Sequence, residues 1–155
     1  MTLLPADASA DAGGPSWVSA GIGSHGYRVT LQARGHTFTA DEPADVGGTD
    51  TGPTPYEYLL AALGSCTVLT LRMYADRKGW PLERAEVLLR SALRHAVDCE
   101  SCETNEVGPK ELEREVLLEG PLTEDQRTRL LAIADRCPIK QTLERGVRVM
   151  ASLPA

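Results

Sequence analysis

The chain has 155 residues, four cysteines, three histidines and a formal net charge of −6. This length suggests one domain with enough material for one hydrophobic core. The composition, 42% hydrophobic and 25% charged, is ordinary for a folded protein. The acidic balance argues against nucleic acid or an anionic membrane as the main partner.

The N-terminus, MTLLPADASADAGGP, lacks the basic segment and the apolar segment of a secretory signal. The longest uncharged apolar stretch, residues 58–71, is shorter than the roughly 18 residues that span a bilayer. We therefore predict a cytoplasmic protein without a membrane or nucleic-acid partner. In that compartment, paired cysteines more often serve catalysis or metal binding than a structural disulfide.

Residues 1–15 are rich in Ala, Asp, Gly and Pro, which predicts a disordered tail before a single domain over residues 16–155. Short β-like runs begin at residue 17. The clearest run, residues 27–34, alternates apolar and polar side chains, and a second strand is predicted over residues 36–39. Residues 41–55, rich in Gly, Pro, Asp and Thr, indicate a loop.

A long helix is predicted from Pro55 to about Lys78. Thr54 before Pro55 is typical of a helix start, and Gly79 followed by Pro81 is typical of a helix end. Its main stripe comprises Tyr56, Leu59, Leu60, Leu63, Thr67, Thr70, Leu71 and Tyr74, with Cys66 among them. The opposite side is apolar too, which predicts a helix that is buried all round.

Strands are predicted over residues 84–97 and 111–119, with a loop between them. Antiparallel pairing would set the glutamates of the second strand against Arg90 and Arg94, and opposite charges favour such pairing. His95 falls on the first of these strands, and Cys99 and Cys102, which are considered with it below as metal ligands, fall in the loop.

Thr123 is predicted to cap a helix that ends near Arg136. A short helix over residues 137–143 and a final strand over residues 147–151 follow. Strands, long helix, strands, helix and strand in this order indicate an α+β fold rather than βαβ winding.

Cys66 lies in LGSCT within the long helix. One interpretation is a core cysteine that behaves as a small hydrophobic residue, and the other is a reactive thiol. Gly64 costs about 1 kcal/mol relative to Ala inside a helix, and such a glycine usually allows another group to approach closely. It would give space to a substrate beside Cys66, or let two helices cross.

Cys137 precedes Pro138 and is placed to cap the short helix. A helix N-terminus stabilises a thiolate, and the neighbouring Arg136 would add to this effect. Cysteine is not a favoured N-cap residue, so a functional thiol stands beside the simpler interpretation of a cap that happens to be cysteine.

His95, Cys99 and Cys102 form an H-x-x-x-C-x-x-C segment. It has three interpretations: a zinc site completed by a ligand such as Asp98, Glu103 or a second subunit, a redox pair, or a loop without an essential cysteine. A single C-x-x-C does not decide between them. Phosphate-loop and serine-hydrolase motifs are absent from the sequence.

Two segments together resemble the OsmC/Ohr family, the osmotically inducible protein C and organic hydroperoxide resistance proteins. They are GPTPYEYLLAALGSCT, residues 52–67, and ADRCPIKQTL, residues 134–143, and the resemblance covers residues 26–150. It implies an OsmC-like α+β fold, in which antiparallel sheets surround long central helices in an intertwined homodimer. The active sites would then lie at the dimer interface.

The resemblance also implies a peroxidase without a cofactor. Cys66 would be the peroxidatic cysteine that attacks an organic hydroperoxide, and Cys137 would be the resolving cysteine. An external thiol would reduce the disulfide. The family supplies an arginine to the thiolate, and Arg28 on the alternating strand is the preferred candidate over Arg34.

One position departs from the family pattern. Members with peroxidase chemistry usually carry Glu ten residues before the first cysteine, where this sequence has Tyr56. Glu57 follows, about 100° further around the helix, and is the candidate to hold the arginine. The alternative function is a non-peroxidase OsmC-like protein that binds a small molecule or senses redox state, with zinc at His95, Cys99 and Cys102.

Overall fold

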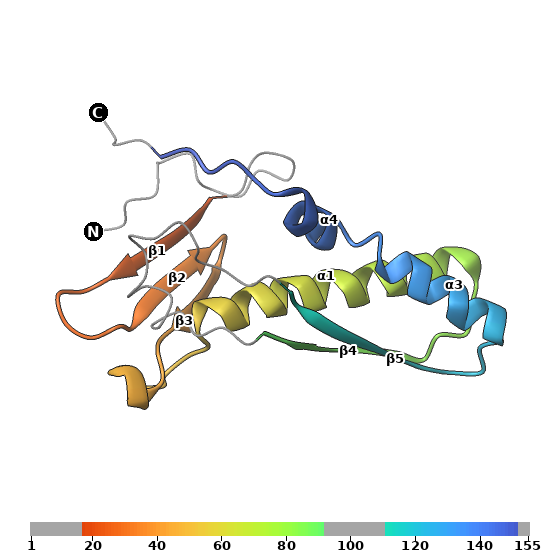
Figure 1. Ribbon diagram of the computed structural model, residues 1–155, viewed down its shortest axis with the longest axis horizontal. Helices are drawn as coiled ribbons and strands as arrows, with labels where there is room; N and C mark the ends of the chain where they lie inside the picture. Colours follow the sequence, from red (N-terminus) through yellow and green to blue (C-terminus); the bar gives the residue numbers. More distant parts are fainter. Residues whose placement is uncertain (1–16, 92–110, 152–155) are drawn as a thin grey trace. The chain divides into compact units, whose positions relative to one another are not determined.

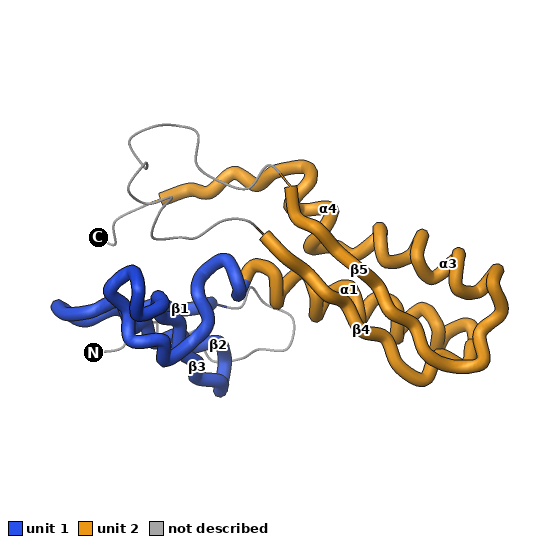
Figure 2. The backbone as a smooth tube through the Cα atoms, turned by 60° about the horizontal axis from the view of Figure 1, so that its bottom comes forward, with its two compact units in different colours: residues 1–58, 93–108 blue, residues 59–92, 109–155 orange. Residues whose placement is uncertain are grey.

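The computed structural model describes residues 17–91 and 111–151 (Figure 1). It divides the chain into two compact units, residues 1–58 with 93–108 and residues 59–92 with 109–155 (Figure 2). The predicted N-terminal tail and the segment with His95, Cys99 and Cys102 lie outside the described residues.

The first unit contains an antiparallel sheet in the order β1-β2-β3. Its strands are β1 (Val18–Ile22), β2 (Val29–Ala33) and β3 (His36–Ala40), so the two strands predicted around Gly35 are confirmed. The first of them is shorter than predicted. Arg28 directly precedes β2, and Arg34 follows it in the turn with a φ of 54°, so neither arginine lies on the strand.

One carboxylate organises the loop that follows β3, in which η1 (Ala44–Val46) is a single helical turn. Asp41 is buried and accepts hydrogen bonds from the hydroxyls of Thr49 (2.6 Å) and Thr51 (2.8 Å). The backbone amides of Thr49, Thr51 and Glu42 donate to it as well. The Thr49 hydroxyl, followed by the other donors, holds the pKa of Asp41 well below its usual range despite burial.

The long helix is confirmed as α1 (Pro55–Lys78). Its start is a reciprocal cap, because the amide of Glu57 donates to the Thr54 hydroxyl (3.3 Å) and the Thr54 amide donates to the Glu57 carboxylate (2.7 Å). The helix ends at Gly79, whose φ of 64° suits a glycine after the last turn. Glu57 therefore has a capping role in this structure.

The second unit pairs β4 (Arg84–Arg90) with β5 (Glu113–Glu119) in an antiparallel hairpin. Arg90 lies opposite Glu113, with Nε and Oε2 at 2.8 Å, which confirms the charge pairing predicted for this arginine. Both side chains are exposed, so water and salt screen the pair and it contributes little to stability. Arg94 lies outside the described residues.

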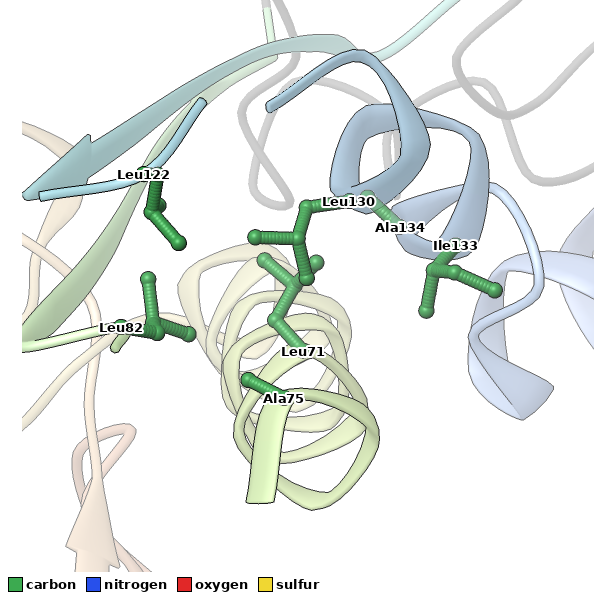
Figure 3. Packing of buried hydrophobic residues seen from close by; sticks show 7 residues of the cluster. All are labelled: Leu71, Ala75, Leu82, Leu122, Leu130, Ile133 and Ala134. Atoms are coloured by element: carbon green, nitrogen blue, oxygen red, sulfur yellow. The ribbon is translucent and has the colours of Figure 1, made fainter. Parts of the chain in front are cut away.

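Two further helices complete this unit, α3 (Glu124–Ala134) and α4 (Pro138–Arg145). Thr123 caps α3 as predicted, and its hydroxyl and the Gln126 side chain form a capping box. The core lies where α1, α3 and the hairpin ends meet, and in Figure 3 Leu71 and Leu130 point toward one another. The cluster comprises Leu71, Ala75, Leu82, Leu122, Leu130, Ile133 and Ala134.

Helix α1 is not buried all round in the described chain, so that prediction is wrong. Only one stripe is buried, namely Leu63, Thr67, Leu71 and Ala75. On the opposite side Leu69 is 56% and Met73 is 70% exposed, because α3 and the hairpin cover one face only. By length and composition alone α1 is also apolar enough to cross a membrane, a property that core helices of soluble proteins share.

The strand predicted over residues 147–151 is wrong as well. This segment has no regular structure, and Val147, Val149 and Met150 are 66%, 88% and 79% exposed. A strand forms when a neighbour satisfies its backbone N–H and C=O groups. None of the strands within residues 17–91 and 111–151 pairs with it.

Replacing Asp41 with Asn should lower the melting temperature by several degrees at neutral pH, because the amide turns a donor toward the Thr49 and Thr51 donors. The lowered pKa means that Asp41 adds stability above the ordinary carboxyl pKa of about 3.9, and that this stability is lost as the pH falls. Thermal unfolding of both proteins from pH 7 to pH 2 should show the difference shrinking below about pH 4.

The matched control is Asp50→Asn, in the same loop. Asp50 is exposed, has a φ of 53° that Asn also tolerates, and makes no side-chain hydrogen bond among the described residues. It should leave the melting temperature nearly unchanged. Equal effects of the two variants would contradict the role given to Asp41.

Candidate functional site

Two cysteines meet in the second unit, and they are the two that the sequence singled out. Cys66 comes from the middle of α1 and is partly exposed, whereas Cys137 stands at the start of α4 and is fully buried. The Cys66 thiol and the Cys137 sulfur are in hydrogen-bonding contact, and both cysteines are free. The structure thus brings together two thiols from separate helices.

The backbone between α3 and α4 places Cys137. Its amide donates to Ala134 O (3.3 Å) at the end of α3, and Pro138 occupies the first turn of α4. Arg114 of β5 holds this link by donating to Ala134 O (3.1 Å) and to the Asp135 carboxylate (2.7 Å). The predicted cap at Cys137 is confirmed, and α4 extends two residues beyond the predicted end, to Arg145.

The surroundings of Cys137 favour a thiolate. Burial alone would raise the pKa of Cys137, but the Cys66 thiol and the backbone N–H groups of Lys140 and Ile139 outweigh it. The net effect is a pKa below the ordinary value of a thiol. The two amides belong to the first turn of α4, where a helix stabilises negative charge.

Thr67 is a further member of the site that the sequence analysis placed only in the apolar stripe. It is fully buried, and its hydroxyl contacts the Cys137 sulfur and helps to lower the pKa of Cys137. The single hydroxyl hydrogen points to Leu63 O (2.8 Å), so full donation to sulfur needs a rotation about the Cβ–Oγ bond. The available signal was a threonine in a buried stripe directly after Cys66.

The surroundings of Cys66 favour the protonated thiol. Burial raises the pKa of Cys66, and the hydrogen bond and negative charge of Cys137 raise it further. The Ile139 amide and the Thr70 hydroxyl act in the opposite direction without reversing the effect. Of the two sulfurs, Cys137 is therefore the one that loses its proton more readily.

Gly64 allows the hairpin to approach α1. A Cβ atom at this position would lie 2.9 Å from Leu89 Cδ1 of β4, so the close neighbour is a strand and not a second helix. The glycine also lines an open hollow of about 430 Å³ between α1 and β4, together with Val68 and Val87. The helix crossing foreseen for this glycine is therefore not what it permits, and the space that it leaves lies on the hairpin side of α1.

A larger open hollow of about 690 Å³ is lined by residues of α1, which carries Cys66, of β5 and the two residues before it, and of α4, which Cys137 precedes. Leu63 lies one turn before Thr67, and Lys140 is the residue whose amide faces Cys137. The lining is apolar at Leu59, Leu63, Leu112 and Leu143 and charged at Glu111, Glu113, Arg114, Lys140 and Glu144. Such a surface suits a small molecule with an apolar body and a polar end.

The remaining predicted site residues stay predictions. Arg28, Arg34 and Glu57 belong to the first unit, the two arginines are exposed, and the Glu57 carboxylate is engaged at the start of α1. Their placement near Cys66 is not tested. Across residues 17–91 and 111–151, the structure holds no group of three or more His, Cys, Asp or Glu side chains that would suit a metal.

The chain belongs to the OsmC-like protein family. The model of this family matches residues 48–152, a span that contains both site cysteines, and this confirms the resemblance drawn from residues 52–67 and 134–143. No curated protein gives a significant sequence match to the chain.

Solved structures share the fold at low identity. An OsmC-like protein from Mycoplasma pneumoniae has a TM-score of 0.66 and 18% identity, over 85% of this chain and 89% of its own. An organic hydroperoxide resistance protein from Legionella pneumophila has 0.59 and 16%, over 86% and 91%. Another from Elizabethkingia anophelis has 0.58 and 16%, over 81% and 84%. The predicted α+β, OsmC-like class is thereby confirmed.

Replacing Thr67 with Val should raise the pKa of Cys137, because valine keeps the shape of the side chain but has no hydroxyl for the sulfur. The pH dependence of thiolate absorbance near 240 nm measures this, in a Cys99→Ser/Cys102→Ser background. Thr70→Val is the matched control: Thr70 contacts Cys66 instead, so this variant should change the Cys66 part of the titration and leave the Cys137 part in place. A thiolate titration that is identical with and without the Thr67 hydroxyl would contradict its role.

Proposed function

We propose that the protein is a thiol-dependent peroxidase that reduces organic hydroperoxides through Cys66 and Cys137. The observation that carries this proposal is the contact between two free thiols of unequal exposure. A peroxide can reach the partly exposed sulfur, and the buried sulfur is already in place to attack it next. The family, and the relatives named for organic hydroperoxide resistance, support the same chemistry.

In the first step the Cys66 thiolate attacks a peroxide oxygen. The O–O bond breaks, an S–O bond forms, and the departing alkoxide takes a proton and leaves as an alcohol, so that Cys66 becomes a sulfenic acid. In the second step the Cys137 thiolate attacks the Cys66 sulfur. The S–S bond forms, and hydroxide leaves and is protonated to water.

An external dithiol completes the cycle by thiol–disulfide exchange, which returns two electrons and two protons to the cysteines. The cycle requires no cofactor. The apolar part of the 690 Å³ hollow supports an organic rather than an inorganic peroxide. Arg28, with Arg34 as the alternative, is the proposed cation beside Cys66 when the substrate is bound, and Glu57 is the proposed residue that orients it.

The proposed assembly is an intertwined homodimer. Helix α1 exposes an apolar face at Ala62, Leu69 and Met73, which fall on one side at about 100° per residue. Exposed apolar faces of this kind mark association surfaces. The same association would give the extended residues 147–151 a neighbour. Cytoplasmic localisation and the lack of nucleic-acid and membrane partners stay predictions.

The second candidate function is small-molecule binding or redox sensing without turnover, with a zinc ion at His95, Cys99 and Cys102. The observation that favours binding is the open hollow of about 690 Å³ lined by α1, β5 and α4, together with the engagement of Glu57 in the helix cap. It predicts saturable binding of an apolar ligand without peroxide consumption. Elemental analysis of protein purified without chelator tests the zinc ion.

Cys66→Ser should abolish consumption of cumene hydroperoxide, because Cys66 is the partly exposed thiol that has a second thiol, Cys137, in contact with it within residues 17–91 and 111–151. Cys137→Ser should permit one turnover and then over-oxidation of Cys66. Stopped-flow oxidation with cumene hydroperoxide and with hydrogen peroxide, followed by disulfide mapping, measures both. Cys99→Ser/Cys102→Ser is the control and should keep full activity, whereas full activity of Cys66→Ser would refute the assignment.

Leu69→Glu/Met73→Glu should convert the dimer to a monomer, because two charges would enter its apolar interface. Size-exclusion chromatography with light scattering measures the mass. Leu131→Glu is the matched control, because Leu131 is a leucine on α3 with comparable exposure, 48%. A monomeric wild-type protein, or a dimeric double variant, would refute the interface.

A further inference from the structure

Arg114 lies on the face of β5 that is turned toward the core. Every second residue of this strand, from Arg114 through Val116 to Leu118, is half-buried, and the residues between them are exposed. Val116 and Leu118 pack against the core cluster, whereas the third position on this face holds a guanidinium that is only 16% exposed. A charge in such a position costs stability unless hydrogen bonds compensate for it, so its partners indicate what it holds in place.

The partners of Arg114 lie where α3 ends and the chain turns into α4. Its Nη1 donates to Ala134 O (3.1 Å), and its Nη2 donates to the carboxylate of Asp135 (2.7 Å). Ala134 O also accepts the amide of Cys137 (3.3 Å), so the guanidinium and the cysteine backbone share one acceptor. The side chain of Arg114 therefore holds the carbonyl to which Cys137 is itself attached.

Helix α4 does little to fix Cys137 by packing, because none of its eight residues is buried. Two backbone hydrogen bonds join the α3–α4 link to α3, namely those from the amides of Arg136 and Cys137. The side chain of Arg114 joins the same link to the hairpin. The burial of Cys137 therefore depends on how this link is held rather than on the burial of the helix that the cysteine caps.

Resting on the proposed function, we propose that Arg114 is a positioning residue for the resolving step, because it fixes the α3–α4 link and so keeps the Cys137 sulfur within reach of Cys66. In that step the Cys137 thiolate attacks the Cys66 sulfenic acid, the S–S bond forms, and hydroxide leaves and is protonated to water. Such an attack depends steeply on placement, and a shift of about 1 Å can cost about a hundredfold in rate. The first step, attack of Cys66 on the peroxide, does not depend on this placement.

The test separates the two steps in Arg114→Met, which keeps an unbranched apolar stem but has no donor. All proteins carry Cys99→Ser/Cys102→Ser. Stopped flow with cumene hydroperoxide and a sulfenic acid trap measures formation of the sulfenic acid at Cys66 and its decay to the disulfide. The rate of formation should stay unchanged, and the rate of decay should fall roughly tenfold or more. Unchanged decay, or an equal loss in both steps, would overturn the inference.

Arg127→Met is the matched control, because Arg127 also joins α3 to the hairpin, at the end of α3 that is remote from Cys137. Its guanidinium donates to Leu118 O (2.7 Å) and to Gly120 O (3.0 Å), so its replacement removes a comparable pair of hydrogen bonds. Both variants should lower the melting temperature, but only Arg114→Met should slow the resolving step. Similar slowing in both variants would mean that Arg114 acts through overall stability alone, and the inference would fail.

Arg114→Lys tests geometry against charge, and it keeps the inference open to test if Arg114→Met does not fold. Lysine retains the positive charge but lacks the planar fork that reaches two acceptors at once. It should recover only part of the resolving rate. A rate below that of the wild type supports the positioning role, and full recovery would show that the charge alone suffices and would overturn it.

A second measurement does not depend on peroxidase activity. The aromatic disulfide dithiobis(nitrobenzoate) converts the partly exposed Cys66 to a mixed disulfide and releases one coloured thiolate. Cys137 then attacks the Cys66 sulfur, and the second coloured thiolate leaves as the S–S bond forms. Slower release of the second thiolate in Arg114→Met, with the first release unchanged, supports the inference, and equal release in variant and wild type overturns it. Absence of peroxide consumption by the wild type would refute the proposed function separately.

Discussion

The packing of one stripe of α1 determines where the two thiols meet. The buried stripe consists of residues at four-residue intervals, Leu63, Thr67, Leu71 and Ala75. Its C-terminal part, Leu71 and Ala75, belongs to the core cluster that α3 completes. At about 100° per residue, Cys66 falls between this buried stripe and the exposed face that contains Leu69. Its sulfur is therefore partly exposed and still close to the start of α4. A different rotation of α1 would bury Cys66 or turn it away from Cys137.

Local signals predicted most of the elements because their causes are local. The cap at Thr54, the glycine after Lys78 and the alternation before Gly35 each depend on a few neighbouring residues, and the structure has the corresponding boundaries. The failures have non-local causes. A strand at residues 147–151 needs a neighbour that the described chain does not supply, and the exposed half of α1 depends on what packs against it, which composition does not reveal.

The candidate site shows the same division. The position of Cys137 as a helix cap could be predicted from Pro138. The opposite pKa shifts of the two thiols could not, because they depend on which amides and hydroxyls face each sulfur. The role of Thr67 could not be predicted for the same reason, because its hydroxyl contacts the Cys137 sulfur only when the start of α4 lies beside α1. Glu57 is the opposite case: the sequence made it a candidate for the site, and in the structure its carboxylate accepts a hydrogen bond from the Thr54 amide.

The separation of exposure from acidity in the cysteine pair has a consequence for the proposed peroxidase reaction. Oxidation of cysteine follows both thiolate character and accessibility. Cys137 has the lowered pKa but is buried, whereas Cys66 is partly exposed but has the raised pKa. Neither sulfur alone is therefore a ready target in the resting protein. Reaction at Cys66 then requires that this thiol lose its proton while a substrate is in place. The contact between the two sulfurs, which permits the disulfide, is also the contact that would control when the first sulfur becomes reactive.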